Sequence, residues 1–255
     1  MRLSLLAPFL LAAALAGPIP ALAQDDGGPA IEPEAMAALQ KMGSFLQTLK
    51  SFSVKGVASY DEALPRGLQA QDDSTATIDV VRPDHVRAEQ ASDRRHRLLV
   101  YDGKTFSVYS KTSGYYAQAP VAATIYQLAG KLESDYAVNL PLLDLFVWAD
   151  PQAAKPAISV ARVAGLATIG GIACDQYVFR EPGRDWQVWL RRGAQPLPLR
   201  VVFTDTRKES RPQFRADYEW TLDARPAASA FAFTPPAAAI EVPIKRMMDM
   251  APQRK

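Results

Sequence analysis

The segment QFRADYEWTL, residues 213–222, carries the pattern on which the fold prediction depends. Phe214 and every second residue after it as far as Leu222 are apolar, and the charged Arg215, Asp217 and Glu219 lie between them. Successive side chains of an extended strand point to opposite faces. The segment therefore predicts a β-strand with one buried face and one solvated face.

The same alternation recurs through most of the chain. It is found at 51–61, 74–82, 98–101, 105–109, 159–169, 172–179, 185–192 and 197–205. Two dipeptides that tolerate positive φ, Asp102-Gly103 and Gly170-Gly171, separate neighbouring segments and predict tight hairpins. Successive strands joined by short turns predict an antiparallel meander.

Three segments are predicted to be helical, two of them from their periodicity. Residues 34–50 and 123–137 repeat apolar side chains at intervals of three and four. The almost wholly apolar segment 139–150 places Pro141 after a possible cap at Asn139, which suits a short helix. We predict a mainly β protein with helices (α+β), in which an N-terminal helix and a mid-chain helical lid cover the sheet.

The N-terminal residues have the pattern of a secretory signal. Arg2 precedes an apolar run and an Ala-Leu-Ala cleavage site, which predicts cleavage before Gln24. The expected organisation is a signal peptide at 1–23, a flexible leader at 24–33, one domain at 34–244 and a basic tail at 245–255. The protein is expected to leave the cytoplasm.

Composition argues against several classes of function. The net charge of +2 comes from evenly mixed charges, so a nucleic-acid partner is not expected. Cys174 is the single cysteine, which excludes an internal disulfide, and one cysteine with two histidines is too few soft ligands for a structural zinc. We expect neither a metal nor a cofactor.

A search for catalytic groups favours a protein that is not an enzyme. The sequence contains none of the patterns G-x-S-x-G, H-E-x-x-H, G-x-x-x-x-G-K and G-x-G-x-x-G. His85 follows a turn and His96 lies in the charged run SDRRHR, so both are expected to be exposed rather than catalytic. The carboxylates of Asp175, Glu181 and Asp185 have no spacing that favours an acid pair over solvated strand positions.

Large apolar side chains on neighbouring strands are the candidate ligand-binding residues. Such residues fill either a solid core or the wall of an apolar cavity, and both alternatives remain open. The candidates on strands are Phe106, Trp186, Val188, Leu190, Phe203 and Trp220, and those on the lid are Leu142, Leu143, Phe146 and Trp148.

Arg82 is the polar exception on a predicted apolar face. It shares the parity of Ala76, Ile78 and Val80, so its guanidinium points where these apolar side chains point. Either the strand ends before it and the side chain reaches solvent, or its donors hold carbonyl oxygens of a covering segment or of a ligand.

Several segments together resemble a known family. VVRPDHVRAE (80–89), LLVYDGKTFSVYS (98–110) and FAFTPPAAAIEV (231–242) resemble, in the same order, segments of LolA, the periplasmic carrier of lipoproteins. From Glu34 to about Val242 the chain more closely resembles a family of predicted periplasmic proteins of unknown function that is grouped with the LolA and LolB fold. The marks of this second resemblance are SDRRHR (92–97), residues 102–117, LPLLDLF (140–146), residues 185–200 and TPP (234–236).

The resemblance implies a LolA-like open half-barrel of about eleven antiparallel strands around an apolar cavity. It also implies that Arg82 bonds to lid carbonyls in a closed state and releases them when a lipoprotein binds. We therefore expect a periplasmic, non-enzymatic carrier for an acyl chain, lipid or lipoprotein. The alternative is an envelope sensing or interaction module that binds a membrane-associated protein partner and no lipid.

Overall fold

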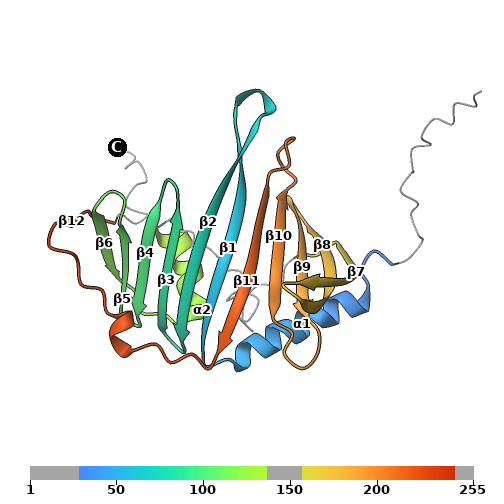
Figure 1. Cartoon of the computed structure of the whole chain (residues 1–255), viewed down its shortest axis with the longest axis horizontal. Coiled ribbons are helices and arrows are strands. Elements are labelled where there is room, and N and C mark those ends of the chain that lie inside the picture. The colour runs from blue at the N-terminus through green and yellow to red at the C-terminus, as the bar shows by residue number, and fades with distance from the viewer. Residues whose placement is uncertain (1–28, 137–156, 245–255) are drawn as a thin grey trace, which may run out of the picture.

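The computed structural model describes residues 29–136 and 157–244, and in these ranges the chain forms one open sheet (Figure 1). The signal peptide, residues 24–28 of the leader, the predicted lid and the tail lie outside the described residues. From edge to edge the strands are β12 (Ile240–Glu241), β6 (Tyr115–Pro120), β5 (Thr105–Ser110), β4 (His96–Asp102), β3 (His85–Ser92), β2 (Gln69–Val81), β1 (Ser51–Ala63), β11 (Gln213–Leu222), β10 (Pro198–Asp205), β9 (Arg184–Arg191), β8 (Ile172–Glu181) and β7 (Val160–Ile169).

The sheet is a meander except at its centre, where β1 pairs with β11, and at one edge, where β12 pairs with β6. Neighbouring strands are antiparallel, and β1 pairs with both β2 and β11, which joins the two halves of the chain. The described residues form twelve strands rather than about eleven, and the additional pair, β12 with β6, is parallel. β12 has two residues, too few for an alternating pattern to reveal it in the sequence.

Two helices cover one face of the sheet, which we call the inner face; the opposite face is the outer face. Figure 1 shows α1 (Pro33–Thr48) and α2 (Ile125–Tyr136) behind the sheet. Both elements were predicted from their periodicity, and the predicted stripes are buried at Met42 and Leu46 on α1 and at Leu128 and Leu132 on α2. These side chains form one cluster with the inner-face residues of the strands.

The strand register decides which side chains face the helices. Phe52 pairs with Leu222 and Val80, and Val54 pairs with Trp220 and Ile78. Residues with even numbers on β1, β2 and β11 therefore share the inner face, as the alternation in 213–222 predicted. Two short 3₁₀ helices, η1 (Pro65–Gly67) and η2 (Ala228–Phe231), lie in connections.

The two predicted hairpins form, with one correction. Gly170 and Gly171 both have positive φ between Ile169 and Ile172, as expected. At the other turn Tyr101 pairs with Phe106, so the central residues are Gly103 and Lys104 rather than Asp102 and Gly103. The Asp102 carboxylate accepts hydrogen bonds from the N–H groups of Lys104 and Thr105, which fixes the turn from its first position.

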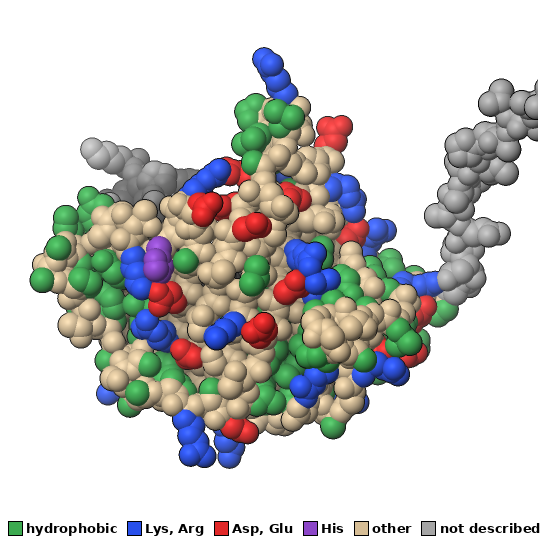
Figure 2. All heavy atoms as spheres, in the orientation of Figure 1, with side chains coloured by type: hydrophobic (Ala, Val, Ile, Leu, Met, Phe, Trp, Pro, Cys, Tyr) green, Lys and Arg blue, Asp and Glu red, His purple; other side chains and the backbone are tan. Residues whose placement is uncertain are grey.

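The outer face carries mixed charges (Figure 2). Glu89 on β3 bonds to Arg87 on the same strand at 3.1 Å, to His96 on β4 at 2.8 Å and to Lys111 in the β5–β6 turn. Hydrogen bonds from Lys111 and His96 lower the pKa of Glu89 from 4.5 to about 2. Among the described residues, no helix is long and apolar enough to cross a membrane.

Tyr101 binds the connection between β6 and α2 through its hydroxyl group. The hydroxyl lies 2.9 Å from the carbonyl oxygen of Val121 and 2.7 Å from that of Ala123, and it accepts the N–H of Ala123 at 2.9 Å. We predict that Tyr101→Phe lowers the free energy of unfolding by about 1–3 kcal/mol in urea denaturation, because it leaves buried backbone groups without a partner. Tyr109→Phe on β5 is the control, since its hydroxyl has no partner in the described part of the chain. Equal effects of the two variants would contradict this role.

The Glu89 cluster predicts a defined acid sensitivity. Because the folded pKa lies below the ordinary value of 4.5, the cluster stabilises the protein above that pH, and the contribution is lost as the pH falls from 4.5 toward 2. We expect Glu89→Gln to cost about 1–2 kcal/mol at pH 7, after solvent screening is considered. The cost should shrink as denaturation is repeated at lower pH. Glu219→Gln, an outer-face change outside this cluster, should not reproduce that pH dependence.

Candidate functional site

A row of aromatic side chains crosses five neighbouring strands on the inner face. The register pairs Phe179 of β8 with Trp186 of β9, Trp186 with Phe203 of β10, Phe203 with Phe214 of β11, and Phe214 with Tyr60 of β1. Paired residues lie opposite one another on the same face. We call these five residues the aromatic row.

Ring contacts continue along most of the row. The ring centroids of Phe179 and Trp186 lie 4.2 Å apart, those of Trp186 and Phe203 6.3 Å apart, and those of Phe203 and Phe214 6.2 Å apart. The row also passes from core to solvent, because Phe179 and Trp186 are each 1% exposed whereas Tyr60 is 45% exposed. The row therefore presents an apolar surface that is accessible at one end.

A pocket of about 390 Å³ opens over the exposed part of the row. Tyr60, Phe203 and Phe214 line it, and we call it the aromatic pocket. The guanidinium of Arg184 lies 4.8 Å from the centroid of Phe203 and bonds to Glu181 at 3.0 Å. This volume falls within the range of ligand pockets in proteins.

Glu181 also fixes the position of Trp186. The indole Nε1 donates to its carboxylate at 2.6 Å, so the buried tryptophan has a partner for its polar atom. Arg207 hydrogen-bonds to Asp205 beside the same pocket and lowers the pKa of that carboxyl to about 2. The carboxylates of Glu181 and Asp205 are thus each paired with an arginine.

A second, polar pocket of about 210 Å³ adjoins the first and shares Tyr60 and Phe214 with it. We call it the polar pocket. Its other polar lining residues come from β1, β2, β3, β4 and the β3–β4 turn: Ser59, Asp72, Ser74, Gln90, Ser92, Arg95 and Arg97. An apolar surface and a polar pocket are therefore continuous at this end of the sheet.

Arg82 lies at the opposite end of the inner face, where it binds the C-terminus of α1. Its Nε donates to the carbonyl oxygen of Leu49 at 2.8 Å, and a terminal nitrogen donates to that of Leu46 at 3.2 Å. Of the two alternatives for Arg82, the structure therefore has the one in which its donors hold carbonyls of a covering segment. That segment is α1.

The structure divides the predicted strand candidates between two ends of the inner face. Trp186 and Phe203 belong to the aromatic row, whereas Phe106, Leu190 and Trp220 lie toward the end that holds Arg82. Phe106, Trp186, Val188 and Leu190 are buried in the core. Leu142, Leu143, Phe146 and Trp148 lie outside the described residues, so their expected role stays a prediction.

The sequence reasoning did not select Phe179, Phe214 and Tyr60 for the site. The alternation placed Phe214 and Tyr60 on apolar faces, but only the pairing of β1 with β11 puts them level with Trp186 and Phe203. Because that pairing joins distant parts of the chain, no local pattern could have found it. The signal available in the sequence was that five predicted strands each have an aromatic residue near one end.

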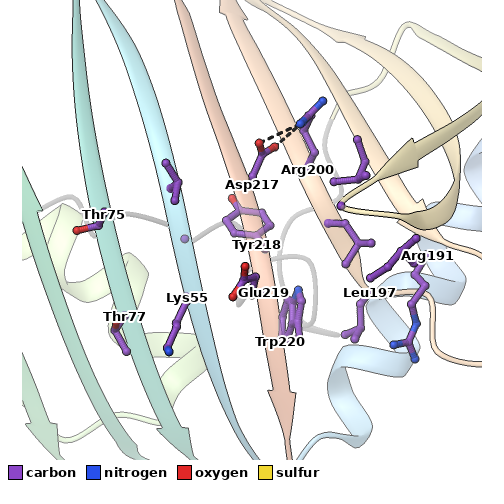
Figure 3. A pocket seen from close by; sticks show the side chains of 16 residues that line it. Lys55, Thr75, Thr77, Arg191, Leu197, Arg200, Asp217, Tyr218, Glu219 and Trp220 are labelled. Atoms are coloured by element: carbon purple, nitrogen blue, oxygen red, sulfur yellow. Dashed lines mark hydrogen bonds and ion pairs between the residues drawn. The ribbon is translucent and has the colours of Figure 1, made fainter.

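A larger pocket of about 660 Å³ lies where β10 and β11 separate, and we call it the outer groove (Figure 3). The two strands pair from Arg200 with Asp217 to Thr204 with Gln213 and diverge beyond Arg200. Figure 3 shows the Arg200–Asp217 ion pair at its margin. The outer groove shares no lining residue with the aromatic pocket or the polar pocket. It is lined by Trp220, one of the predicted ligand-binding candidates.

The described residues give no indication of a metal or redox centre. They contain no group of three or more His, Cys, Asp or Glu side chains that could hold a metal ion. Cys174 is buried, and burial raises the pKa of its thiol. The side chains of His85 and His96 are 40% and 39% exposed, and each bonds to a carboxylate, Asp84 and Glu89 respectively.

The fold and its pockets define a class: an open antiparallel sheet with helices on one face and, on that same face, a row of aromatic side chains that is exposed at one end. Residues 35–245 match the family model described as predicted periplasmic protein (DUF2092), and the chain belongs to this family. The family resemblance found in the sequence is therefore confirmed, and so is the periplasmic localisation. No similar sequence was found among curated proteins.

Several solved structures resemble the chain at low identity. An uncharacterised conserved protein from Thermus thermophilus has a TM-score of 0.45 at 13% identity, over 82% of this chain and 99% of that chain. LprF from Mycobacterium bovis has a TM-score of 0.44 at 13% identity, with the same coverage of 82% and 99%. The MucA/MucB complex of Pseudomonas aeruginosa has a TM-score of 0.43 at 15% identity, over 79% of this chain and 61% of that chain. These likenesses are too distant to carry an argument about function.

Proposed function

We propose that the protein binds the acyl chain of a lipid or lipoprotein on its inner face and catalyses no reaction on it. The observation that carries this proposal is the aromatic row, which runs from the core at Phe179 and Trp186 to the solvent at Tyr60. A single acyl chain is long and narrow, and it can lie along a row of rings that crosses the strands. Each methylene removed from water contributes about 0.8 kcal/mol.

The aromatic pocket supports entry of the chain at the exposed end. Three of its lining residues, Tyr60, Phe203 and Phe214, are aromatic and offer apolar contact to such a chain. Contact with Tyr60, Phe203 and Phe214 would cover rings that solvent now reaches. An acyl chain of sufficient length would extend from there toward Trp186.

Removal of an exposed ring tests the binding surface. We expect Tyr60→Ser to weaken binding of a fluorescent fatty acid by about tenfold, because roughly 1.5–3 kcal/mol of apolar contact is lost when a large side chain is removed. Tyr115→Ser on β6 is a matched control, since Tyr115 is 46% exposed but lies away from the row. An equal loss in both variants would contradict a role specific to the row.

The presence of a natural ligand is tested by native mass spectrometry of protein purified from a periplasm without detergent, followed by organic extraction. A stoichiometric mass of lipid size supports the proposal and identifies the chemistry of the ligand. An apo mass that is unchanged after incubation with phospholipid and with a triacylated lipopeptide would contradict it.

Arg82 is proposed to couple ligand occupancy to the position of α1. It holds the two carbonyl groups at the end of this helix, and an inner-face ligand that displaced the helix would have to break these bonds. We expect Arg82→Leu to accelerate release of the fatty acid several-fold in stopped-flow measurements, with Arg82→Lys intermediate because it keeps one charged donor. Thermal unfolding of both variants separates this effect from loss of the fold. Unchanged retention and release in a folded Arg82→Leu protein would exclude the role.

A second candidate function is binding of a protein partner, and the outer groove favours it. Val57 and Ile172 line this groove and are 64% and 42% exposed, so apolar surface is available away from the inner face. Crosslinking from Val57 would recover a membrane-associated partner in this case. A variant with Val57→Asp would lose the partner but keep lipid binding if the two sites act separately.

A further inference from the structure

We infer that the polar pocket binds the anionic head group, a phosphate ester or a carboxylate, of the lipid whose chain lies on the aromatic row. This inference rests on the proposed function and specifies its ligand. It distinguishes an anionic amphiphile from the uncharged diacylglyceryl anchor of a lipoprotein, two ligands that the row alone would accept equally.

The arginines around the aromatic pocket are already paired with carboxylates. Arg184 bonds to Glu181 at 3.0 Å and Arg207 bonds to Asp205 at 2.9 Å. Asp185, next to Trp186 in sequence, is bonded by Arg180 at 2.7 Å and by Arg211 at 3.0 Å. Positive charge on this side of the site is therefore neutralised within the protein.

Arg95 and Arg97 are different. Both line the polar pocket and are exposed, and their side chains have no hydrogen bond or ion pair with any residue that the structure describes. Arg94, which precedes them in the SDRRHR run, bonds instead to Glu62 at 3.0 Å. Among the lining residues Asp72 is the one carboxylate, so the pocket has an excess of positive charge.

The register places this charge where the aromatic row ends. Tyr60 pairs with Asp72 on β2, and the neighbouring inner-face pairs are Ser74 with Ser92 and Gln90 with Arg97. The row of rings on β8 to β1 therefore continues with the Asp72 carboxylate on β2, followed by hydroxyl, amide and guanidinium groups on β2 to β4. A molecule lying across the strands would meet apolar contacts first and polar groups, the two arginines among them, at its end.

Guanidinium groups fit this ligand chemistry. The planar fork of an arginine donates two parallel hydrogen bonds to a phosphate or a carboxylate, and these charge-assisted bonds are stronger than bonds between neutral groups. Ser74, Ser92 and the Gln90 amide supply further donors at the same pocket. An uncharged head group would gain nothing from the two arginines.

The test compares short-chain lipids that share their acyl chains and differ in their head groups. Dioctanoyl phosphatidylglycerol, uncharged dioctanoylglycerol, decanoate and inorganic phosphate are titrated separately into the delipidated mature chain by isothermal titration calorimetry. We expect phosphatidylglycerol to bind about tenfold more tightly than dioctanoylglycerol at low ionic strength, with the difference reduced by salt. Decanoate tests the carboxylate form of the same chemistry.

Variants assign the effect to the two arginines. Arg97→Gln and Arg95→Gln should each reduce binding of phosphatidylglycerol and of decanoate by roughly three- to tenfold and leave dioctanoylglycerol unchanged. Arg94→Gln is the matched control, because it removes the same charge from the same SDRRHR run but from a side chain that is paired with Glu62. It should leave all affinities within about twofold.

The outcomes separate this inference from the proposed function. Equal affinity for phosphatidylglycerol and dioctanoylglycerol, unaffected by Arg97→Gln, would overturn the head-group assignment and keep the acyl-binding proposal. Failure of every lipid to bind would overturn both. Inorganic phosphate that binds as tightly as phosphatidylglycerol, with no effect of Tyr60→Ser on the lipid, would make the pocket a phosphate site and would also overturn the assignment.

Discussion

The register between β1 and β11 is the constraint on which the rest of the structure depends. It aligns residues 52–60 with residues 222–214 and so joins the strands β2 to β6 to the strands β10 to β7 in one sheet. Because side chains alternate, a slip of one residue would move Phe214 and Trp220 to the outer face and place Arg215 and Glu219 under the helices. The cost of burying these charges specifies the register strongly.

Local patterns predicted most elements, because each element depends on residues close together in the sequence. The stripes of α1 and α2, the alternating strands and the Gly170-Gly171 turn all have a period or a turn residue that the sequence displays. Two features depend on contacts between distant segments and have no local signal. They are the parallel pairing of β12 with β6 and the pairing of Tyr60 with Phe214. For the same reason the sequence identified Trp186 and Phe203 as inward residues but could not show that they belong to one row.

The inner face has two chemically different ends. At one end Arg82 satisfies carbonyl groups of α1, which closes the sheet against its helix. At the other end the rings of the aromatic row meet the polar pocket and remain partly exposed. Asp72 lies on β2 and Arg82 directly follows its last residue, Val81, so the two are about 33 Å apart at the usual rise of a strand. The contact with α1 and the proposed ligand access are thus at opposite ends of β2.

The central position of β1 also has a consequence for the order in which the chain becomes structured. A polypeptide that crosses a membrane N-terminus first delivers β1 to β6 before β11 is available. During that interval one edge of a thirteen-residue strand carries unpaired backbone groups and the apolar Phe52 and Val54. Pairings between distant segments form slowly, and such an intermediate is prone to associate with other chains. A holding chaperone at the site of export would therefore be needed most before residues 213–222 emerge.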